Sequence, residues 1–421
     1  MINQNANESA KKVYSFMREK FQKKIISGVM TLNVLGGNNA PLPVFEQEDV
    51  AHVRSASQKT PAILGVDFMH ATGKSTTESW FISYTEATLA MAKEIYDLGG
   101  IPTYSWHWRD PSQKTDSFYS GGDTPTDFDF TAACVDALCA SWNTNSNIYK
   151  EMTRDIDIIA GYLKTLQTQG VAVLWRPLHE ASGGWFWWGA KGAVPFKSLY
   201  KLVYDRLTNH HGLNNLIWVW NSDGSDLSWY PGNDYVDIIG RDFYYYPRET
   251  NHASLIGEFE TIKNVFGTSK MISLSEHGSV PYPENLIADG ADWSYFMPWY
   301  GDYVTQDNSV SDWDQIMNHD YVITLEDMPG WANYSVGLAP PPKNTFNSVR
   351  YENGALHFSQ TVLAEVSIEV FDLKGTSVGV LYRGALSAGE HLFSLRNYSK
   401  GVYFVRVKTA LQNKTVRVSV P

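Results

Sequence analysis

Short apolar runs rich in β-branched residues recur along most of the chain, and a polar or aromatic stretch with helical periodicity follows nearly every one. This order is typical of strands buried on both faces that alternate with helices. The pattern predicts eight strands, at Ile25–Met30, Ala62–Asp67, Ile101–Trp106, Val171–Arg176, Leu216–Trp220, Val236–Gly240, Met271–Ser275 and Tyr321–Leu325.

Two of the intervening segments have clear helical limits. Helical spacing runs over Glu86–Leu98, which Gly99 and Gly100 close, and over Ile148–Thr168, which Gly170 closes. Eight strands alternating with helices favour an α/β fold, the (β/α)8 TIM barrel. An open doubly wound sheet is the alternative. It would show a glycine-rich phosphate turn, and the glycines after the first strand lack that spacing and a helix directly after them.

The pattern changes after the segment Gly337–Asn344, where three consecutive prolines end regular structure. Beyond it, apolar residues alternate with polar ones over Ala364–Phe371, Gly401–Thr409 and Thr415–Val420. Such short runs, separated by glycine-containing turns, predict an all-β sandwich. We therefore expect two domains: a barrel over residues 1–337 and a small immunoglobulin-like β-sandwich over residues 338–421.

Charge is divided unevenly between these two parts. The chain has 34 basic and 45 acidic residues, a net charge of −11. Residues 338–421 contain 10 basic and 5 acidic residues, so they carry +5 and the rest of the chain −16. Because there is no long basic run, nucleic acid and anionic membranes are disfavoured as partners. No apolar run approaches the ~18 residues of a membrane span.

Neither the N-terminus nor the two cysteines indicate a catalytic or metal-binding function. Met1–Tyr14 has no apolar core and is therefore not a signal peptide. We expect a mature form with an added start methionine. Cys134 and Cys139 lie five residues apart in an expected helix and would point in different directions, so we expect neither a disulfide nor a metal site from them.

Aromatic residues are the unusual feature of the composition. The chain has 15 Trp and 24 Tyr, and every tryptophan precedes the prolines. Flat aromatic rings stack on the apolar faces of sugars, which makes carbohydrate the leading substrate class. Trp185, Trp187 and Trp188 lie in a loop bracketed by glycines, so at least one of them should be exposed for stacking.

The active site of a barrel lies at the carboxyl ends of its strands. Two glutamates follow strands that face each other across the barrel, Glu180 after the fourth and Glu276 after the seventh. Such a pair can hydrolyse a glycosidic bond, because one carboxylic acid protonates the leaving oxygen while the other stabilises or attacks the anomeric carbon. A separation near ~5.5 Å would indicate retention of configuration, and one near ~9 Å inversion.

Two alternatives belong to other functional classes. His107, His179 and His277 could hold the metal of a metal-dependent hydrolase. No His-x-His or His-Glu-x-x-His pair occurs, which favours hydrogen-bonding roles, so we expect no metal and no cofactor. The other alternative is a non-catalytic glycan-binding protein, which the presence of both glutamates disfavours.

The segment Trp175–Gly189 (WRPLHEASGGWFWWG) resembles the acid/base motif of glycoside hydrolase family 26, whose members are mostly endo-β-1,4-mannanases. Ser273–Gly278 (SLSEHG) resembles the nucleophile strand of that family. The resemblance covers roughly residues 20–335 and implies a retaining endo-β-1,4-mannanase that acts on mannan, glucomannan or galactomannan. Further matching segments are Gly65–Phe68, Ser105–Trp108, Trp218–Asn221 and Gly240–Tyr244.

Carried over residue by residue, the resemblance implies that Glu180 is the acid/base and Glu276 the nucleophile of a double displacement. After Trp299 the chain has Tyr300, where some family mannanases have an arginine that grips a more distant sugar. The family also contains β-1,3-xylanases and β-1,3-1,4-glucanases, which remain alternatives. The substrate sites implied around the cleaved bond are lined by His107, Trp108, His179, Trp185, Asp242, Tyr244 and Trp299.

The tail has a resemblance of its own. Val366–Phe371, Gly401–Phe404 and Lys414–Arg417 resemble the β-sandwich sorting domain of Bacteroidetes-type secretion. This resemblance implies export by a secretion machinery, a secreted or cell-surface location, and a signal peptide that has been removed. A carbohydrate-binding module is the alternative, which the lack of tryptophan disfavours. We expect a monomer.

Overall fold

The computed structural model describes residues 1–335 except 225, and residues 346–420 except 353, 361, 362, 374, 410 and 411. The chain divides into two compact units, Met1–Phe259 with Met271–Gly337, and Glu260–Lys270 with Leu338–Pro421. The expected domain boundary between residues 337 and 338 lies outside the described residues, as do the three prolines.

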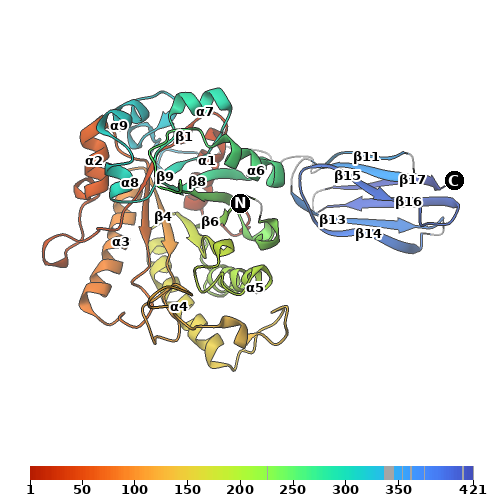
Figure 1. Ribbon diagram of the computed structural model, residues 1–421, viewed down its shortest axis with the longest axis horizontal. Coiled ribbons are helices and arrows are strands. Elements are labelled where there is room, and N and C mark those ends of the chain that lie inside the picture. Colours follow the sequence, from red (N-terminus) through yellow and green to blue (C-terminus); the bar gives the residue numbers. More distant parts are fainter. Residues whose placement is uncertain are drawn as a thin grey trace. The chain divides into compact units, whose positions relative to one another are not determined.

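Eight parallel strands form the sheet of the first unit, in chain order from β2 to β9 (Figure 1). Ile26, just before the first of them, forms a parallel bridge with Tyr295, just before the last, so the sheet closes on itself. The expected (β/α)8 barrel is confirmed. The strands are β2 (Gly28–Met30), β3 (Ile63–Asp67), β4 (Ile101–Trp106), β5 (Val173–Pro177), β6 (Leu216–Ser222), β7 (Ile238–Phe243), β8 (Met271–His277) and β9 (Phe296–Pro298).

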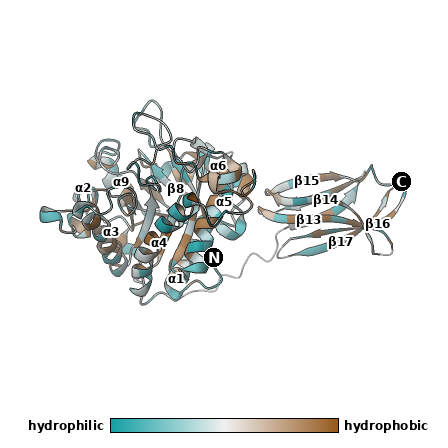
Figure 2. Cartoon of the chain, turned by 90° about the horizontal axis from the view of Figure 1, so that it is seen from below, coloured by the Kyte–Doolittle hydropathy of each residue, from teal (hydrophilic) through white to brown (hydrophobic). Residues whose placement is uncertain are grey.

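Helices surround this sheet, and every residue of β3, β4, β5, β6 and β8 is buried. In Figure 2 the helices carry both hydrophobic and hydrophilic residues, as expected of helices that cover a sheet on one side. Among the described residues, no helix combines the length and the apolar character needed to cross a membrane. The helices are α1 (Glu8–Lys20), α2 (Glu48–Ser57), α3 (Ser79–Asp97), α4 (Asn147–Thr168), α5 (Ala193–Tyr204), α6 (Ile256–Phe266), α7 (Pro283–Asp289), α8 (Asp302–Thr305) and α9 (Val310–Met317).

The eighth strand of the barrel is not the predicted one. Within Tyr321–Leu325, Val322–Ile323 forms β10, which pairs in parallel with β1 (Ile25–Ile26) in a separate two-stranded sheet. The barrel is completed instead by β9, whose three residues are Phe-Met-Pro. This strand is too short and too poor in β-branched residues to show a strand pattern. The prediction was wrong because β10 has the apolar pattern of a strand, and a pattern does not reveal which strand it pairs with.

The prediction for the two cysteines was also wrong, since Cys134 and Cys139 form a disulfide. The segment is not helical, because a single 3-10 turn, η3 (Phe130–Ala133), ends before the first cysteine. The Asp136 carboxylate then accepts hydrogen bonds from the backbone N–H groups of Leu138 and Ala140. This turn brings the two Cα atoms to 4.7 Å, within the range that a disulfide can bridge.

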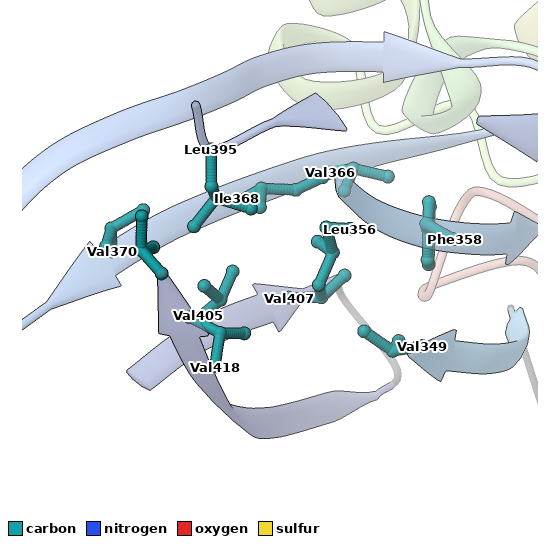
Figure 3. Close-up of a cluster of buried hydrophobic side chains, with 11 residues drawn as sticks. Val349, Leu356, Phe358, Val366, Ile368, Val370, Leu395, Val405, Val407 and Val418 are labelled. Carbon is teal, nitrogen blue, oxygen red and sulfur yellow. The ribbon is translucent and has the colours of Figure 1, made fainter. Parts of the chain in front are cut away.

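The described residues of the second unit form seven strands in two antiparallel sheets, β11-β12-β15 and β14-β13-β16-β17. Alternate residues of β12 and β13 are buried, and side chains from both sheets form one core, which includes Ile368, Val405 and Leu356 (Figure 3). The expected β-sandwich is confirmed. The strands are β11 (Phe346–Glu352), β12 (Ala355–Gln360), β13 (Ala364–Phe371), β14 (Ser377–Leu386), β15 (Gly389–Ser394), β16 (Gly401–Lys408) and β17 (Asn413–Val420).

Candidate active site

Polar side chains gather at the carboxyl ends of four consecutive barrel strands. Arg176 lies near the end of β5, Asn221 near the end of β6, Asp242 near the end of β7 and Glu276 near the end of β8, and all four are buried. Glu180 is the third residue after β5. Because parallel barrel strands end at one face, this topology brings the five side chains together.

Arg176 links two of the carboxylates. Its Nη1 donates to Asp242 Oδ2 at 2.7 Å, and its Nη2 donates to Glu276 Oε2 at 2.8 Å. Burial alone would lower the pKa of Arg176, but the two carboxylates raise it, so the guanidinium stays charged. Asn221 Nδ2 donates to Asp242 Oδ1 at 2.7 Å, and the Tyr244 hydroxyl donates to Glu276 Oε1 at 2.8 Å. Both oxygens of Glu276 therefore accept a hydrogen bond from a fixed donor.

An irregularity in the pairing of β7 with β8 sets these carboxylates opposite each other. The register shifts after Arg241, so Asp242 pairs with Glu276 and skips one residue of β8. Bulges of this kind redirect side chains and are frequent next to active sites.

Glu180 has a different environment. Its backbone is left-handed, with φ +53°, and Leu178 has φ +54°. Such conformations cost residues other than glycine about 1–3 kcal/mol each and concentrate at functional sites. The Trp185 indole N–H donates to Glu180 Oε2 at 3.1 Å. Burial, followed by the negative charges of Glu276 and Asp242, raises the pKa of Glu180 to about 9.

Glu180, Asp242 and Glu276 each place one carboxylate oxygen within 4.8 Å of the other two. In the described part of the chain no other group of three His, Cys, Asp or Glu residues could hold a metal ion, so the three histidines do not form such a group. Burial raises the pKa of Asp242 to about 7, although the positive charge of Arg176 acts to lower it. Because two of the carboxylates already pair with Arg176 and Glu180 retains its proton, the arrangement suits acid–base chemistry better than cation binding.

His107 and His179 form a second polar group. Asp67, the last residue of β3, accepts from the backbone N–H of His107 at 3.1 Å and from the Ser105 hydroxyl at 2.7 Å, and it also binds His107 Nδ1. The Nε2 atoms of His107 and His179 lie 3.3 Å apart. Burial lowers the pKa of His179 well below its usual value, so its ring is neutral. Asp67 thus fixes the orientation of the His107 ring.

The tryptophans of the loop after β5 divide as predicted. Trp185 is 47% exposed, whereas Trp187 and Trp188 are buried. The Trp188 indole N–H donates to the carbonyl oxygen of His179 at 2.9 Å, which anchors the loop. A Cβ on Gly183 would lie 1.9 Å from the Trp185 ring, so a larger residue there would have to displace the ring from this position.

Trp108 does not lie at this site, contrary to the prediction. It is fully buried, its ring stacks on Trp106 with centroids 4.1 Å apart, and its indole N–H donates to Asp155 at 2.9 Å. Alternate residues after β4 point in opposite directions, so Trp108 faces the core while His107 faces the site. Trp299, directly after β9, is half-buried with its ring centroid 6.0 Å from that of His107.

The sequence predicts no role for Arg176, Asn221 or Asp67, although each of them contacts a predicted site residue. The available signal is their position: Asp67 and Arg176 are the last residues of runs expected to be buried strands, and Asn221 directly follows such a run. A buried charge or amide needs a polar partner, so its position at a strand end indicates a polar network there.

A cavity of about 190 Å³ opens beside this group. A larger hollow of about 450 Å³ lies beside β1 and β10 and is lined by none of these side chains. The smaller cavity is lined by Glu180, Ser182, Gly183, Trp185, Asn221, Ser222, Asp223, Arg241 and Asp242.

Comparison with known proteins relates both units to described families. Residues 2–327 match the model of glycosyl hydrolase family 26, and residues 340–420 match the secretion system C-terminal sorting domain. A mannan endo-1,4-beta-mannosidase of Thermothelomyces thermophilus is 38% identical over 341 residues, which are 79% of this chain and 64% of the relative. Mannan endo-1,4-beta-mannosidase A of a Piromyces species is 31% identical over 334 residues, 79% of this chain and 51% of the relative. The chain thus spans less than two thirds of the length of these curated relatives.

Solved structures give the same relationship. The beta-mannanase from a symbiotic protist of the termite Reticulitermes speratus, complexed with gluco-manno-oligosaccharide, has 40% sequence identity and a TM-score of 0.69, covering 78% of this chain and 97% of that one. The Podospora anserina GH26-CBM35 beta-(1,4)-mannanase has 37% identity and a TM-score of 0.66, covering 79% of this chain and 69% of that one. With a family match over most of its length and a barrel of the same fold, the chain belongs to glycosyl hydrolase family 26.

Proposed function

We propose that the chain is a retaining endo-β-1,4-mannanase that hydrolyses mannan, glucomannan or galactomannan. The observation that carries this proposal is a pair of glutamates in opposite environments, with carboxylate oxygens within 4.8 Å of each other. Retaining glycosidases keep their two carboxyl groups ~5–5.5 Å apart and inverting ones ~6.5–9.5 Å apart, so the short separation supports retention. The mannanase names of the relatives support the substrate class.

In the first step, Glu276 attacks the anomeric carbon while Glu180 gives its proton to the glycosidic oxygen. The bond between that carbon and the oxygen breaks, the leaving chain departs as an alcohol, and a glycosyl ester of Glu276 remains. The raised pKa of Glu180 supports its role as the acid, because it still carries a proton at neutral pH. The hydrogen bonds from Arg176 and Tyr244 support Glu276 as the carboxylate.

In the second step, Glu180 takes a proton from water, and the water oxygen attacks the same carbon. The ester bond breaks, Glu276 returns to its carboxylate form, and the sugar leaves with its original configuration. The negative charge of Glu276 is one cause of the raised pKa of Glu180, and the ester has no such charge. Forming the ester therefore lowers the pKa of Glu180 at the point where it must act as a base.

We assign the sugar contacts around the cleaved bond to side chains at or beside this group. Mannose carries an axial 2-hydroxyl, which needs a polar partner off the ring plane, and His107 with its fixed orientation is the candidate. Trp185 supplies an exposed apolar ring for stacking. The further contacts are His179, Asp242, Tyr244 and Trp299.

We further propose that the enzyme is exported as a monomer and acts as a secreted or cell-surface protein. The match of residues 340–420 to a sorting domain supports the sandwich as the export signal. The disulfide between Cys134 and Cys139 supports an oxidising compartment, where such bonds persist. Residues 1–337 would then be the catalytic domain and residues 338–421 the sorting domain.

The glutamate roles are tested by substitution. Glu276→Gln and Glu180→Gln should each lower turnover on soluble mannan by several orders of magnitude while the fold is kept. With an activated aryl mannoside, Glu180→Ala should still form the ester but stall in its hydrolysis. NMR of the first product should show the β-anomer. Near-normal activity of Glu276→Gln, or an α-anomer as first product, would contradict the mechanism.

The substrate is tested by comparing initial rates on glucomannan, galactomannan, barley mixed-linkage glucan and β-1,3-xylan. We expect the two mannans to be preferred. A clear preference for either of the other two polysaccharides would overturn the mannan assignment and leave the roles of the glutamates intact.

A further inference from the structure

We propose that Asp49 is a positioning residue, which holds the Trp299 ring in the active site through the backbone of Gly301. This inference rests on the proposed function, in which Trp299 contacts a sugar beside the cleaved bond. Asp49 lies in the first turn of α2, far from the catalytic loops in sequence. Its carboxylate Oδ1 accepts a hydrogen bond from the Gly301 N–H at 2.8 Å, across 252 residues of the chain.

The Asp49 carboxylate is buried and held at both of its oxygens. It is 1% exposed, and its Oδ2 accepts from Gln47 Nε2 at 3.0 Å. The Gln47 side chain is fixed in turn, because its Oε1 accepts from the backbone N–H groups of Asp49 and Val50 at 2.9 and 3.0 Å. Burial raises the pKa of Asp49, while the hydrogen bonds from Gln47 and Gly301 lower it. Since a buried carboxylate needs such donors, the bond to Gly301 fixes both of its partners.

Gly301 has a backbone conformation that suits this anchor. Its φ is +67° and its ψ −121°, a combination that favours glycine. Its carbonyl oxygen accepts from the N–H groups of Val304 and Thr305, each at 2.9 Å, and so begins α8. Helix α2 packs against α8 (Figure 1). The N–H and the carbonyl of Gly301 are therefore both bound, and the turn between β9 and α8 is tied to α2.

Trp299 lies two residues before this anchor. Its own N–H donates to the carbonyl oxygen of His277 at 2.9 Å, so the segment is tied to β8 on one side of Trp299 and to α2 on the other. The Trp299 ring is half-buried, with its centroid 6.0 Å from that of His107. Shifting a substrate-positioning group by about 1 Å can cost about a hundredfold in rate. Loss of the Asp49 anchor should therefore move the ring relative to Glu276 and lower the rate.

The test compares the loss of the carboxylate with a swap that keeps its hydrogen bonds. Asp49→Leu keeps the volume but leaves the Gly301 N–H without its acceptor. On mannohexaose, its kcat/KM should fall about ten- to thirtyfold, because Trp299 loses its fixed position. The double variant Gln47→Glu/Asp49→Asn exchanges the carboxylate and the amide, so an oxygen still accepts from Gly301 and the two side chains still bond. This swap should keep kcat/KM within about twofold of the wild type.

Asp237→Leu is the matched control. Asp237 is also 1% exposed and also accepts from a backbone N–H, that of Trp218 at 3.1 Å. It directly precedes β7 and so lies at the amino ends of the barrel strands, away from the site. At a temperature at which both variants are folded, Asp237→Leu should keep the kcat/KM of the wild type. An equal loss in both variants would show that burial of a carboxylate matters and its place does not, and would overturn the proposal.

A double-mutant cycle with Trp299→Ala shows which residue Asp49 acts through. In the Trp299→Ala background, Asp49→Leu should lower kcat/KM by less than about twofold, because the ring that it positions is gone. Gly301→Ala strains the same anchor from the side of the loop and should be equally non-additive, which keeps the test intact if Asp49→Leu does not fold. Losses that multiply, or wild-type kcat/KM in Asp49→Leu, would overturn the proposal.

Hydrogen exchange separates the anchor from the proposed function, because it needs no substrate. The Gly301 amide should exchange slowly in the wild type and in the swapped pair, and about tenfold or more faster in Asp49→Leu. Mass spectrometry of the peptide that spans residues 299–305 measures this difference. A wild type that does not cleave mannohexaose would overturn the proposed function, and the exchange rates would still decide on the anchor. Equal exchange in all three proteins would overturn the anchor itself.

Discussion

The barrel and the sandwich both bury β-strands, but in opposite ways. Every residue of β4 and β5 is buried, whereas β12 and β13 bury alternate residues. Parallel strands covered by helices have no wet face, while each sandwich sheet keeps one. Only the parallel arrangement also brings the carboxyl ends of all strands to one face. The difference teaches that topology, more than strand content, decides which unit can assemble a catalytic group.

Arginine–carboxylate pairs show the same contrast. Arg176 in the barrel is 1% exposed between two carboxylates, whereas 40% of the Arg406 side chain in the sandwich is exposed beside Glu369. Removing one partner of a buried pair leaves an uncompensated charge, while water replaces a lost partner at the surface. Breaking the same kind of ion pair should therefore destabilise the barrel much more than the sandwich.

Replacing the buried arginine should have the largest effect. Arg176→Met keeps much of the volume but leaves Asp242 and Glu276 without a cation. We expect the free energy of unfolding of the barrel to fall by about 3–5 kcal/mol. Turnover on mannan should fall about a thousandfold, a loss comparable to that of a preorganised transition-state donor, because Glu276 would lose the hydrogen bond and the positive charge that Arg176 supplies.

Steady-state kinetics and thermal unfolding measure these two effects. Arg176→Lys, which keeps the charge but can reach only one carboxylate well, should lie between the wild type and Arg176→Met. Wild-type turnover in Arg176→Met would show that the nucleophile does not need its contact with Arg176.

A core substitution in the sandwich should uncouple stability from catalysis. Ile368 is fully buried in β13, so Ile368→Ala should destabilise the sandwich by about 2–5 kcal/mol. Turnover on soluble mannan should not change, because the catalytic group lies entirely in the barrel. The matched variant is Ile217→Ala in β6, which should lower the unfolding temperature of the barrel instead. A drop in turnover for Ile368→Ala would show that the two units depend on each other.

The strands were largely predictable from sequence, with the eighth strand of the barrel as the exception. Continuous apolar runs revealed seven of the barrel strands, and strict alternation revealed β13. Whether a strand is buried on two faces or on one determines the pattern of its own residues, so the local sequence shows it. The choice between β9 and β10 as the eighth strand depends on which of them closes the sheet between β8 and β2. Because β2 lies near the start of the chain, the local sequence around β9 does not show this pairing. The error at Cys134 and Cys139 has a different, local cause: the turn between them depends on hydrogen bonds to the side chain of Asp136, which helical spacing does not reveal.

The candidate site was predictable in part. Glu180 and Glu276 follow from their places after facing strands. Their different environments do not follow, because the environment of Glu276 depends on Arg176 in β5 and on Tyr244 directly after β7. The misplacement of Trp108 shows that a residue next to a strand end can point either to the site or to the core.

The raised pKa of Glu180 predicts a pH dependence confined to the barrel. Since the pKa is about 9 in the folded state against an ordinary 4.5, the folded state keeps a proton that the unfolded state has lost between these values. Barrel stability should therefore be highest near the lower value and fall as the pH rises toward 9. The amide in Glu180→Gln has no such proton to lose, so the stability of this variant should fall less over the same pH range. Above the pKa, wild-type turnover should drop about tenfold per pH unit, as the acid loses its proton.

Thermal unfolding at pH 5, 7 and 9 checks this difference, with the unfolding of the sandwich as an internal reference. Parallel curves for the wild type and Glu180→Gln would show that Glu180 is ionised in the folded state, and would remove its role as the acid.

The smallest effect is expected for the exposed arginine of the sandwich. Glu369 on β13 accepts from Arg383 and from Arg406, each at 2.9 Å, and Arg406 also lies over the Phe371 ring at 4.4 Å. When Arg406 is replaced by methionine, Arg383 and water can still solvate the carboxylate, so the free energy of unfolding of the sandwich should fall by no more than about 1 kcal/mol. Raising the salt concentration to 1 M should shrink even this difference, because exposed charges are screened over a few ångströms. Denaturant unfolding of both forms at low and high salt measures it. A loss of the size expected for Arg176→Met would mean that the outer face of this sheet is shielded from water in a way that the exposure of Arg406 does not suggest.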